Sequence, residues 1–248
     1  ALVVEPLGDT AILAASLIGA STAPTQREQL LGQIASGELI VALAHQEQNS
    51  RNEYDFQVRT SATRTTDGWS QKHRVFHGAA ANMLLVSAQL EGSTDLGLFI
   101  VDNHSAGLSS EHYELIDGSR GADIRLNDVQ LPATALLLND GLTEEALEQA
   151  LDLAILAGCS AAIGSMEAVM AMTADYLKTR VQYGKPLAQF QALQHRMAEM
   201  FVETDQSRAI LHSALAALES TDAERRRVAI SAAKYQIAKA VYFVASQG

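Results

Sequence analysis

The sequence is poor in the residues that mark disulfide-rich and metal-binding proteins. Only one of its 248 residues is a cysteine, Cys159, which excludes a disulfide within the chain. Cys159 stands among Ala, Gly, Leu and Ile, a setting in which a thiolate site is not expected. The seven histidines are scattered without the paired spacing of zinc ligands, so no metal site is expected either. Such sparse cysteine usage fits a reducing, cytoplasmic location.

Basic residues are also scarce. The chain has 18 Lys and Arg against 29 Asp and Glu, a net charge of −11, so a nucleic-acid partner is not expected. Arg225-Arg226-Arg227 is the only basic cluster. It follows Asp222 and Glu224 at an expected helix start, which favours a solvated helix face over a phosphate-binding patch.

Long hydrophobic runs are missing as well. No stretch of 18 or more residues is free of polar or charged breaks, and the N-terminus lacks a signal-peptide pattern. The sequence therefore predicts a soluble protein without a membrane partner. With 48% hydrophobic positions it can bury a substantial core, and its length favours two domains over one.

The pattern along the chain predicts an α+β fold with three regions. Residues 1–40 have apolar residues at helical spacing, with a helix start at Ser21-Thr22-Ala23-Pro24-Thr25, where a hydroxyl can cap and proline is tolerated. Residues 41–138 have short β-branched and apolar runs between close turns, which predict a small antiparallel barrel or sandwich. Residues 139–248 return to helical spacing. Helices, then strands, then helices lack the alternation of a Rossmann fold.

Three long helices fit the last region. They are expected near Thr143 to Val181, Leu187 to Leu218 and Asp222 to Gln247. Thr143, followed by Glu144 and Glu145, predicts a capped first helix.

One motif goes further than these patterns. Residues 180–195 read RVQYGKPLAQFQALQH, and this stretch resembles the signature that joins two bundle helices in acyl-CoA dehydrogenases. Residues 37–47 resemble the entry to that family's β domain, and residues 126–132 resemble its exit. The resemblance implies the end of an N-terminal helical domain, a central β domain and most of a C-terminal four-helix bundle.

The resemblance also implies FAD as cofactor, bound where two subunits meet. Arg180 would face the pyrophosphate, with Gln182 and Tyr183 beside it and Gln191 and Leu193 near the nucleotide end. A guanidinium matches phosphate oxygens at two places at once. Taken singly, Arg180 could instead complement a helix dipole and Tyr183 could fill a helix corner.

The family's catalytic base is not found. The usual Glu follows a Gln-x-x-Gly-Gly stretch, and the sequence given stops at Gly248 before that stretch would be complete. A minority of the family places the base early in the first bundle helix, where this sequence has Ala154 and Ile155, which cannot move a proton. The earlier Glu144, Glu145 and Glu148 fit capping and solvation, so no catalytic residue is assigned.

The segments that would face the flavin also depart from the family. Gln46-Glu47-Gln48-Asn49 replaces a Thr-Glu-Pro-Gly segment, Arg74-Val75-Phe76 replaces Trp-Ile-Thr, and the stretch around Trp69 is shorter than expected. These departures predict poor flavin binding by the chain alone. His77 lies near this face and could contact the cofactor or make a hydrogen bond at a strand end.

The resemblance is greatest to the smaller, degenerate subunits of bacterial heteromeric acyl-CoA dehydrogenases. It implies an acyl-CoA substrate, a second dehydrogenase subunit and electron-transfer flavoprotein as partners. Two alternatives stay open: a homo-oligomeric (dimeric or tetrameric) dehydrogenase whose base lies on a segment outside this sequence, and a scaffold without enzymatic activity.

Overall fold

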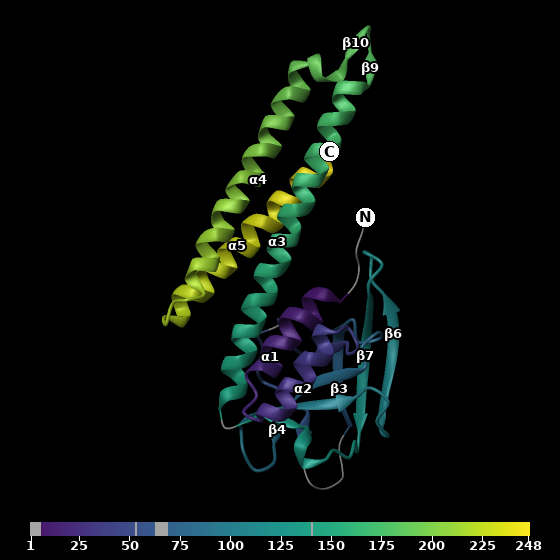
Figure 1. Cartoon of the computed structure of the whole chain (residues 1–248), viewed down its shortest axis with the longest axis vertical. Helices are drawn as coiled ribbons and strands as arrows, with labels where there is room; N and C mark the ends of the chain where they lie inside the picture. The colour runs from purple at the N-terminus through teal and green to yellow at the C-terminus, as the bar shows by residue number, and fades with distance from the viewer. Residues whose placement is uncertain (1–5, 53, 63–68, 140) are drawn as a thin grey trace. The chain divides into compact units, whose positions relative to one another are not determined.

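The computed structural model describes residues 6–52, 54–62, 69–139 and 141–248 (Figure 1). The predicted α+β class is confirmed, with helices at both ends of the chain and two sheets between them. The contacts divide the chain into two compact units, Ala1–Ala154 and Ile155–Gly248. The stretch Trp69-Ser70-Gln71-Lys72, predicted to be shortened, begins a strand directly after residues 63–68, which lie outside the described part of the chain, so the shortening stays a prediction.

The N-terminal segment is helical, as predicted. It forms a π-helix η1 (Gly8–Ala14), then α1 (Ala15–Gly19) and α2 (Pro24–Ala35). Proline is the first residue of α2, where its missing N–H costs nothing. The expected hydroxyl cap is wrong, because Ala23 takes the N-cap position and Ser21 Oγ accepts a hydrogen bond from the Ala23 amide, outside the helix.

The β region forms two sheets rather than a closed barrel in the described residues. The strands of the first sheet are β1 (Val41–Ala44), β2 (Ser61–Ala62), β4 (Met83–Leu90), β5 (Leu96–Asp102) and β8 (Leu136–Leu138). Their order in the sheet is β1-β4-β5-β8, and β2 also pairs with β4. The second has the order β3-β7-β6, with β3 (Trp69–Phe76), β6 (Leu108–Glu114) and β7 (Arg120–Asn127).

The prediction of a purely antiparallel arrangement is wrong. β1 and β2 both pair with β4 in parallel. The chain passes through β3 of the other sheet between β2 and β4, and a connection of that length can return a strand in the parallel direction, which no tight hairpin can do. Apolar residues of both sheets, including Leu84, Val86, Ala122 and Ile124, form one shared core.

The three predicted long helices are confirmed to within a few residues at most of their ends. They are α3 (Leu142–Thr179), α4 (Gln191–Ala217) and α5 (Ala223–Gln247). Asp222 caps α5 by accepting a hydrogen bond from the Arg225 amide at 3.1 Å. The predicted Thr143 cap is wrong, because Thr143 lies in the first turn and its buried Oγ1 has no partner in the described residues.

Helix α3 contributes to both units. Leu147, Ala150 and Leu151 pack with the N-terminal helices and the first sheet. Further along, Leu156 and Met166 pack with α4 and α5. This shared packing explains why the unit boundary falls inside α3, while the domain boundaries expected near residues 40 and 138 stay predictions.

By length and composition alone, α3 could cross a membrane. Its most apolar 18-residue window has a mean hydropathy of 1.7, and 22% of that window is buried. A core helix of a soluble protein passes the same test, and Leu156, Ile163 and Met166 of α3 belong to the core of the second unit.

Candidate functional site

The signature residues form a hairpin at the corner between α3 and α4 (Figure 1). Its strands are β9 (Val181–Gln182) and β10 (Lys185–Pro186), which pair antiparallel. The two residues between them, Tyr183 and Gly184, have φ angles of 52° and 76°. Positive φ at both central residues is what a type I′ hairpin requires, and glycine adopts it without strain. The loop is therefore a defined turn that projects from the helix pair.

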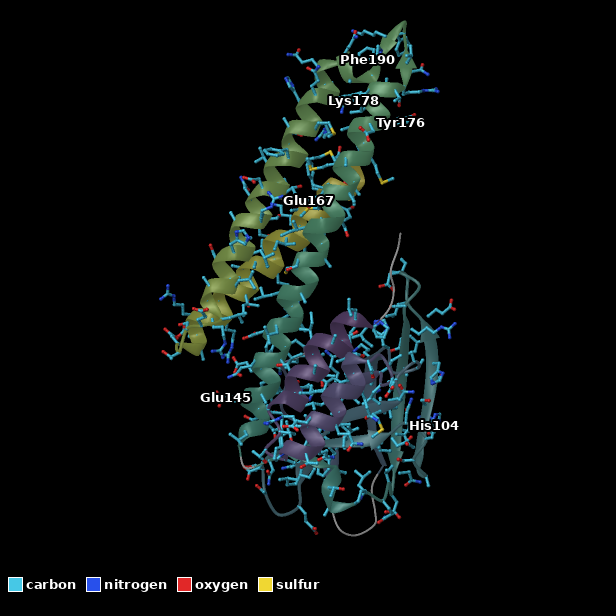
Figure 2. The ribbon with its side chains drawn as sticks, viewed as in Figure 1. His104, Glu145, Glu167, Tyr176, Lys178 and Phe190 are labelled. Atoms are coloured by element: carbon cyan, nitrogen blue, oxygen red, sulfur yellow. The ribbon has the colours of Figure 1, made fainter. Side chains whose placement is uncertain are left out.

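Contacts at the start of α4 brace the hairpin. The Tyr183 and Phe190 rings meet edge to face, with centroids 6.3 Å apart. Lys185 Nζ lies 4.3 Å from the centroid of the Phe190 ring. The Leu187 amide donates to the Arg180 carbonyl at 2.8 Å, which closes the base of the hairpin. Figure 2 shows Phe190 at this corner, near Tyr176 and Lys178 of the last turns of α3.

The corner between α3 and α4 exposes polar side chains that have no partner among the described residues. Arg180, Gln182 and Gln191 are exposed, and their side chains make no hydrogen bond or ion pair with the described residues. Tyr183 is 91% exposed, so the alternative interpretation, that its side chain fills the corner between two helices, is wrong. Leu193 is half-buried in the first turn of α4. All five predicted cofactor residues thus belong to one corner, and an unpaired guanidinium flanked by amides suits a phosphate-bearing ligand.

A second polar site lies in the first unit, and the sequence analysis missed it. Lys72 of β3 is fully buried, and its Nζ donates to Glu47 Oε1 at 3.0 Å. The same Nζ donates to Ser87 Oγ and to the His45 carbonyl, each at 3.3 Å. Glu47 also accepts hydrogen bonds from the Thr60 amide and hydroxyl. Burial lowers the pKa of Lys72 to about 8, against the opposing attraction of Glu47.

These groups tie one loop into the sheets. Glu47 stands at one end of the segment 47–60, and its carboxylate accepts the amides of Arg59 and Thr60 at the other end. His45 Nδ1 lies 2.8 Å from Ser87 Oγ, and its Nε2 has no hydrogen-bond partner in the described residues. Burial first, then the Lys72 charge, lowers the pKa of His45 to about 4. The cluster fixes a loop, and with Ser87 and Lys72 fully buried it offers no accessible nucleophile.

His77 has a partner within the protein. Its Nε2 lies 3.2 Å from Asp9 Oδ2 of the π-helix η1. His77 has a φ of 55° and Arg74 a φ of 52°, so two non-glycine residues near the end of β3 are in the left-handed region. This contact agrees with the prediction of a hydrogen bond at a strand end; the prediction of a cofactor contact is not tested.

An open hollow of about 340 Å³ lies between α3 and α4. Its lining is mostly apolar, with Met170, Met197 and Phe201 among the residues. Two carboxylates stand in the lining, Glu167, which is labelled in Figure 2, and Asp205. Arg208 binds them at 2.5 and 3.0 Å. Both acids are held by a cation, so the hollow provides no base ready for proton abstraction. In the described residues no group of three or more His, Cys, Asp or Glu could hold a metal ion.

The sequence comparison identifies the helical region. The family described as "Acyl-CoA dehydrogenase, C-terminal domain" matches residues 141–248, which include the whole corner. The helical region thus matches the C-terminal domain of acyl-CoA dehydrogenases, and the resemblance found in the sequence is confirmed there.

Similar proteins extend the match beyond the helices. A mitochondrial 2-methylacyl-CoA dehydrogenase of Solanum tuberosum is 28% identical over 199 residues, covering 77% of this chain and 48% of the relative. The solved structure of a Tcur3481–Tcur3483 steroid ACAD variant has 30% identity and a TM-score of 0.76, covering 98% of this chain and 63% of that one. The ChsE4–ChsE5 complex of Mycobacterium tuberculosis has a TM-score of 0.79 at 21% identity, covering 99% of this chain and 64% of that one, a likeness of fold alone.

The chain spans less than two thirds of these acyl-CoA dehydrogenase relatives. The share is 48% of the potato protein and 63 to 64% of the two solved chains. The activity, substrates and partners of the whole protein are therefore matters for proposal.

The two residues predicted to occupy an early base position, Ala154 and Ile155, are not acids. Ala154 and Ile155 are half-buried and pack against apolar cores. The carboxylate nearest in sequence is Asp152, which is buried and accepts a hydrogen bond from Tyr54 Oη at 2.7 Å. Glu144 and Glu145 are exposed in the first turn of α3, where they complement the helix dipole. Figure 2 labels Glu145 at the start of this helix.

Proposed function

We propose that this chain is a subunit of a FAD-dependent acyl-CoA dehydrogenase, and that it supplies part of a shared FAD site without a catalytic base of its own. The observation that carries the proposal is the corner between α3 and α4, where Arg180, Gln182 and Gln191 are exposed and unpaired within the described residues. A defined turn that presents unused phosphate-binding groups outward suits a cofactor held by a neighbouring chain.

The reaction proposed is α,β-desaturation of an acyl-CoA thioester. FAD, when bound, would supply the hydride acceptor for the β carbon, and a carboxylate base would take the proton from the α carbon. In this chain Arg180 would bind the pyrophosphate, Gln182 and Tyr183 would lie beside it, and Gln191 and Leu193 would contact the nucleotide end. Ala154 and Ile155 accept no proton, so the base comes from a second dehydrogenase subunit. Electron-transfer flavoprotein in the cytoplasm would take up the electrons.

Two relatives support a heteromeric reading. The steroid ACAD variant with 30% identity is named as a pair of proteins, Tcur3481 and Tcur3483, and ChsE4–ChsE5 is named as a complex. The alternative is a homo-oligomeric dehydrogenase whose base lies on a further C-terminal segment. It is favoured by the fact that this chain spans less than two thirds of its relatives.

The test is native mass spectrometry of the chain expressed alone and together with a neighbouring acyl-CoA dehydrogenase subunit. We expect little FAD on the chain alone, because Arg74 and Gln46 replace the usual flavin-face residues. Occupancy should rise in the complex, since a ligand bound across an interface requires both chains. One FAD per chain in a homo-oligomer would establish the alternative, and a stable complex without FAD would favour a scaffold role.

A further inference from the structure

Four polar residues inside the first unit are joined in an unbroken row of hydrogen bonds, which we name the relay. Lys72 Nζ donates to Glu47 Oε1 at 3.0 Å and to Ser87 Oγ at 3.3 Å. Ser87 Oγ in turn lies 2.8 Å from His45 Nδ1. None of the four residues is more than 9% exposed, so their polar atoms depend on partners within the protein. The donors and acceptors of each group therefore fix the direction of the next hydrogen bond.

While Lys72 is charged, these directions place the proton of the neutral His45 ring on Nε2. An ammonium group has three donors and no acceptor, and Lys72 directs them to Glu47, to Ser87 and to the His45 carbonyl. Ser87 Oγ accepts from Lys72, so its own hydroxyl proton is directed to His45 Nδ1. Nδ1 must then carry no proton. The remaining proton is on Nε2, which has no hydrogen-bond partner in the described residues.

Loss of a proton from Lys72 reverses this order. A neutral amine has two donors and one lone pair. The Glu47 carboxylate and the His45 carbonyl can only accept, so the Ser87 hydroxyl is the one partner that can donate to the lone pair. Ser87 Oγ then accepts from His45, which requires the proton on Nδ1. Each proton moves one place, from Nζ to Oγ, from Oγ to Nδ1 and from Nε2 to solvent water, and the relay loses one positive charge in total.

We propose that Lys72, Ser87 and His45 form a proton switch, in which deprotonation of Lys72 reverses both hydrogen bonds of Ser87 and moves the imidazole proton of His45 from Nε2 to Nδ1. Nε2 is an N–H donor in one state and a proton acceptor in the other. Burial lowers the pKa of Lys72 to about 8, which sets the midpoint. The carboxylates of Glu47 and Asp55 also act on His45, and Glu47 acts on Lys72. Carboxylates ordinarily titrate several pH units lower. The proposal goes beyond the proposed function and does not depend on FAD.

The test is NMR of the full chain labelled with 15N-histidine and 13C-lysine, from about pH 6.5 to about pH 9.5. The pKa of His45 is about 4, so its ring is neutral throughout, and changes in its two 15N shifts report which nitrogen carries the proton. We expect the ratio of the Nδ1–H to the Nε2–H form to rise about tenfold per pH unit. Its midpoint should coincide with the midpoint of the Lys72 Cε shift. His45→Gln assigns the His45 signals.

The chain contains a matched control. His112 Nε2 lies 2.8 Å from Ser110 Oγ on the exposed strand β6, and no lysine donates to Ser110 in the described part of the chain. His112 should therefore show no reversal near pH 8 in the same spectra. Ser87→Ala removes the link, so His45 should keep a constant tautomer ratio while Lys72 still titrates. Circular dichroism checks that the variant is folded.

Three results would overturn the proposal. One is an unchanged His45 tautomer in the wild type while Lys72 titrates, and another is a Lys72 that stays charged to the top of the pH range. The third is a reversal that persists in Ser87→Ala at the wild-type midpoint. If Ser87→Ala does not fold, the two midpoints in the wild type decide, because only a coupled switch makes them coincide.

Discussion

His45 shows how strongly the interior of the first unit controls single residues. Its ring is 3% exposed and sits between Ser87 and the Phe56 ring, whose centroid is 5.7 Å away. Because burial and the Lys72 charge both oppose a second positive charge, the pKa of His45 falls from 6.5 to about 4. His45 is therefore neutral at physiological pH, with Nδ1 available to accept the Ser87 hydroxyl.

This environment predicts an acid-sensitive fold. Between pH 6.5 and 4 the unfolded chain binds a proton at His45 that the folded chain does not, so stability falls as the pH is lowered through this window. From pH 7 to pH 5 the loss should be about 2 kcal/mol, measured by urea unfolding. His45→Gln, which can still bond to Ser87, should flatten this pH dependence. The exposed His112→Gln is the control, and an unchanged slope in His45→Gln would contradict the assignment.

In the proposed shared site, Arg180 is the residue expected to bind the FAD pyrophosphate. Arg180→Ala should lower FAD retention in the assembled complex by roughly ten- to a hundredfold, corresponding to about 1.5–3 kcal/mol from the lost charge-assisted bonds. FAD retention by Arg180→Lys should lie between those of the wild type and Arg180→Ala, because lysine keeps the positive charge but lacks the planar guanidinium that binds two phosphate oxygens at once. Circular dichroism should not change, since Arg180 is exposed. Lys178→Ala, two residues earlier, should retain FAD like the wild type, and equal retention by Arg180→Ala would remove the argument for sharing.

At the scale of elements, the sequence predicts the helices well and the pairing of distant strands poorly. The three long helices follow from apolar spacing and from breaks such as Gly184-Lys185-Pro186, which are properties of neighbouring residues. The parallel pairing of β1 with β4 joins residues about forty positions apart, and no local pattern records it. The Thr143 cap failed because α3 begins one residue earlier, which moves its hydroxyl into the first turn.

The same difference between local and long-range structure applies to the two polar sites. The corner between α3 and α4 was found because its residues are contiguous in sequence and match a family signature. The Lys72 cluster was missed because its members come from four separate segments, and a lone lysine in a strand pattern usually faces solvent. The signal available in the sequence was a lysine within a strand pattern, Lys72, together with an acid, Glu47, soon after the apolar strand β1. A buried ion pair of this kind costs desolvation and fixes the loop geometry in return.

At the scale of the whole molecule, the proposed function requires a base that Ala154 and Ile155 cannot supply. Neither side chain accepts a proton, and the carboxylate nearest to them in sequence, Asp152, is buried and accepts a hydrogen bond from Tyr54. We therefore expect the isolated chain, mixed anaerobically with added FAD and a panel of acyl-CoAs, to leave the flavin absorbance unchanged. The assembled complex should bleach it. Ala154→Glu should not restore bleaching, because a half-buried carboxylate without an aligned thioester has a raised pKa and no substrate within reach. Stoichiometric bleaching by the isolated chain would show that a base is present in it, and would replace the shared-site proposal with a self-sufficient dehydrogenase.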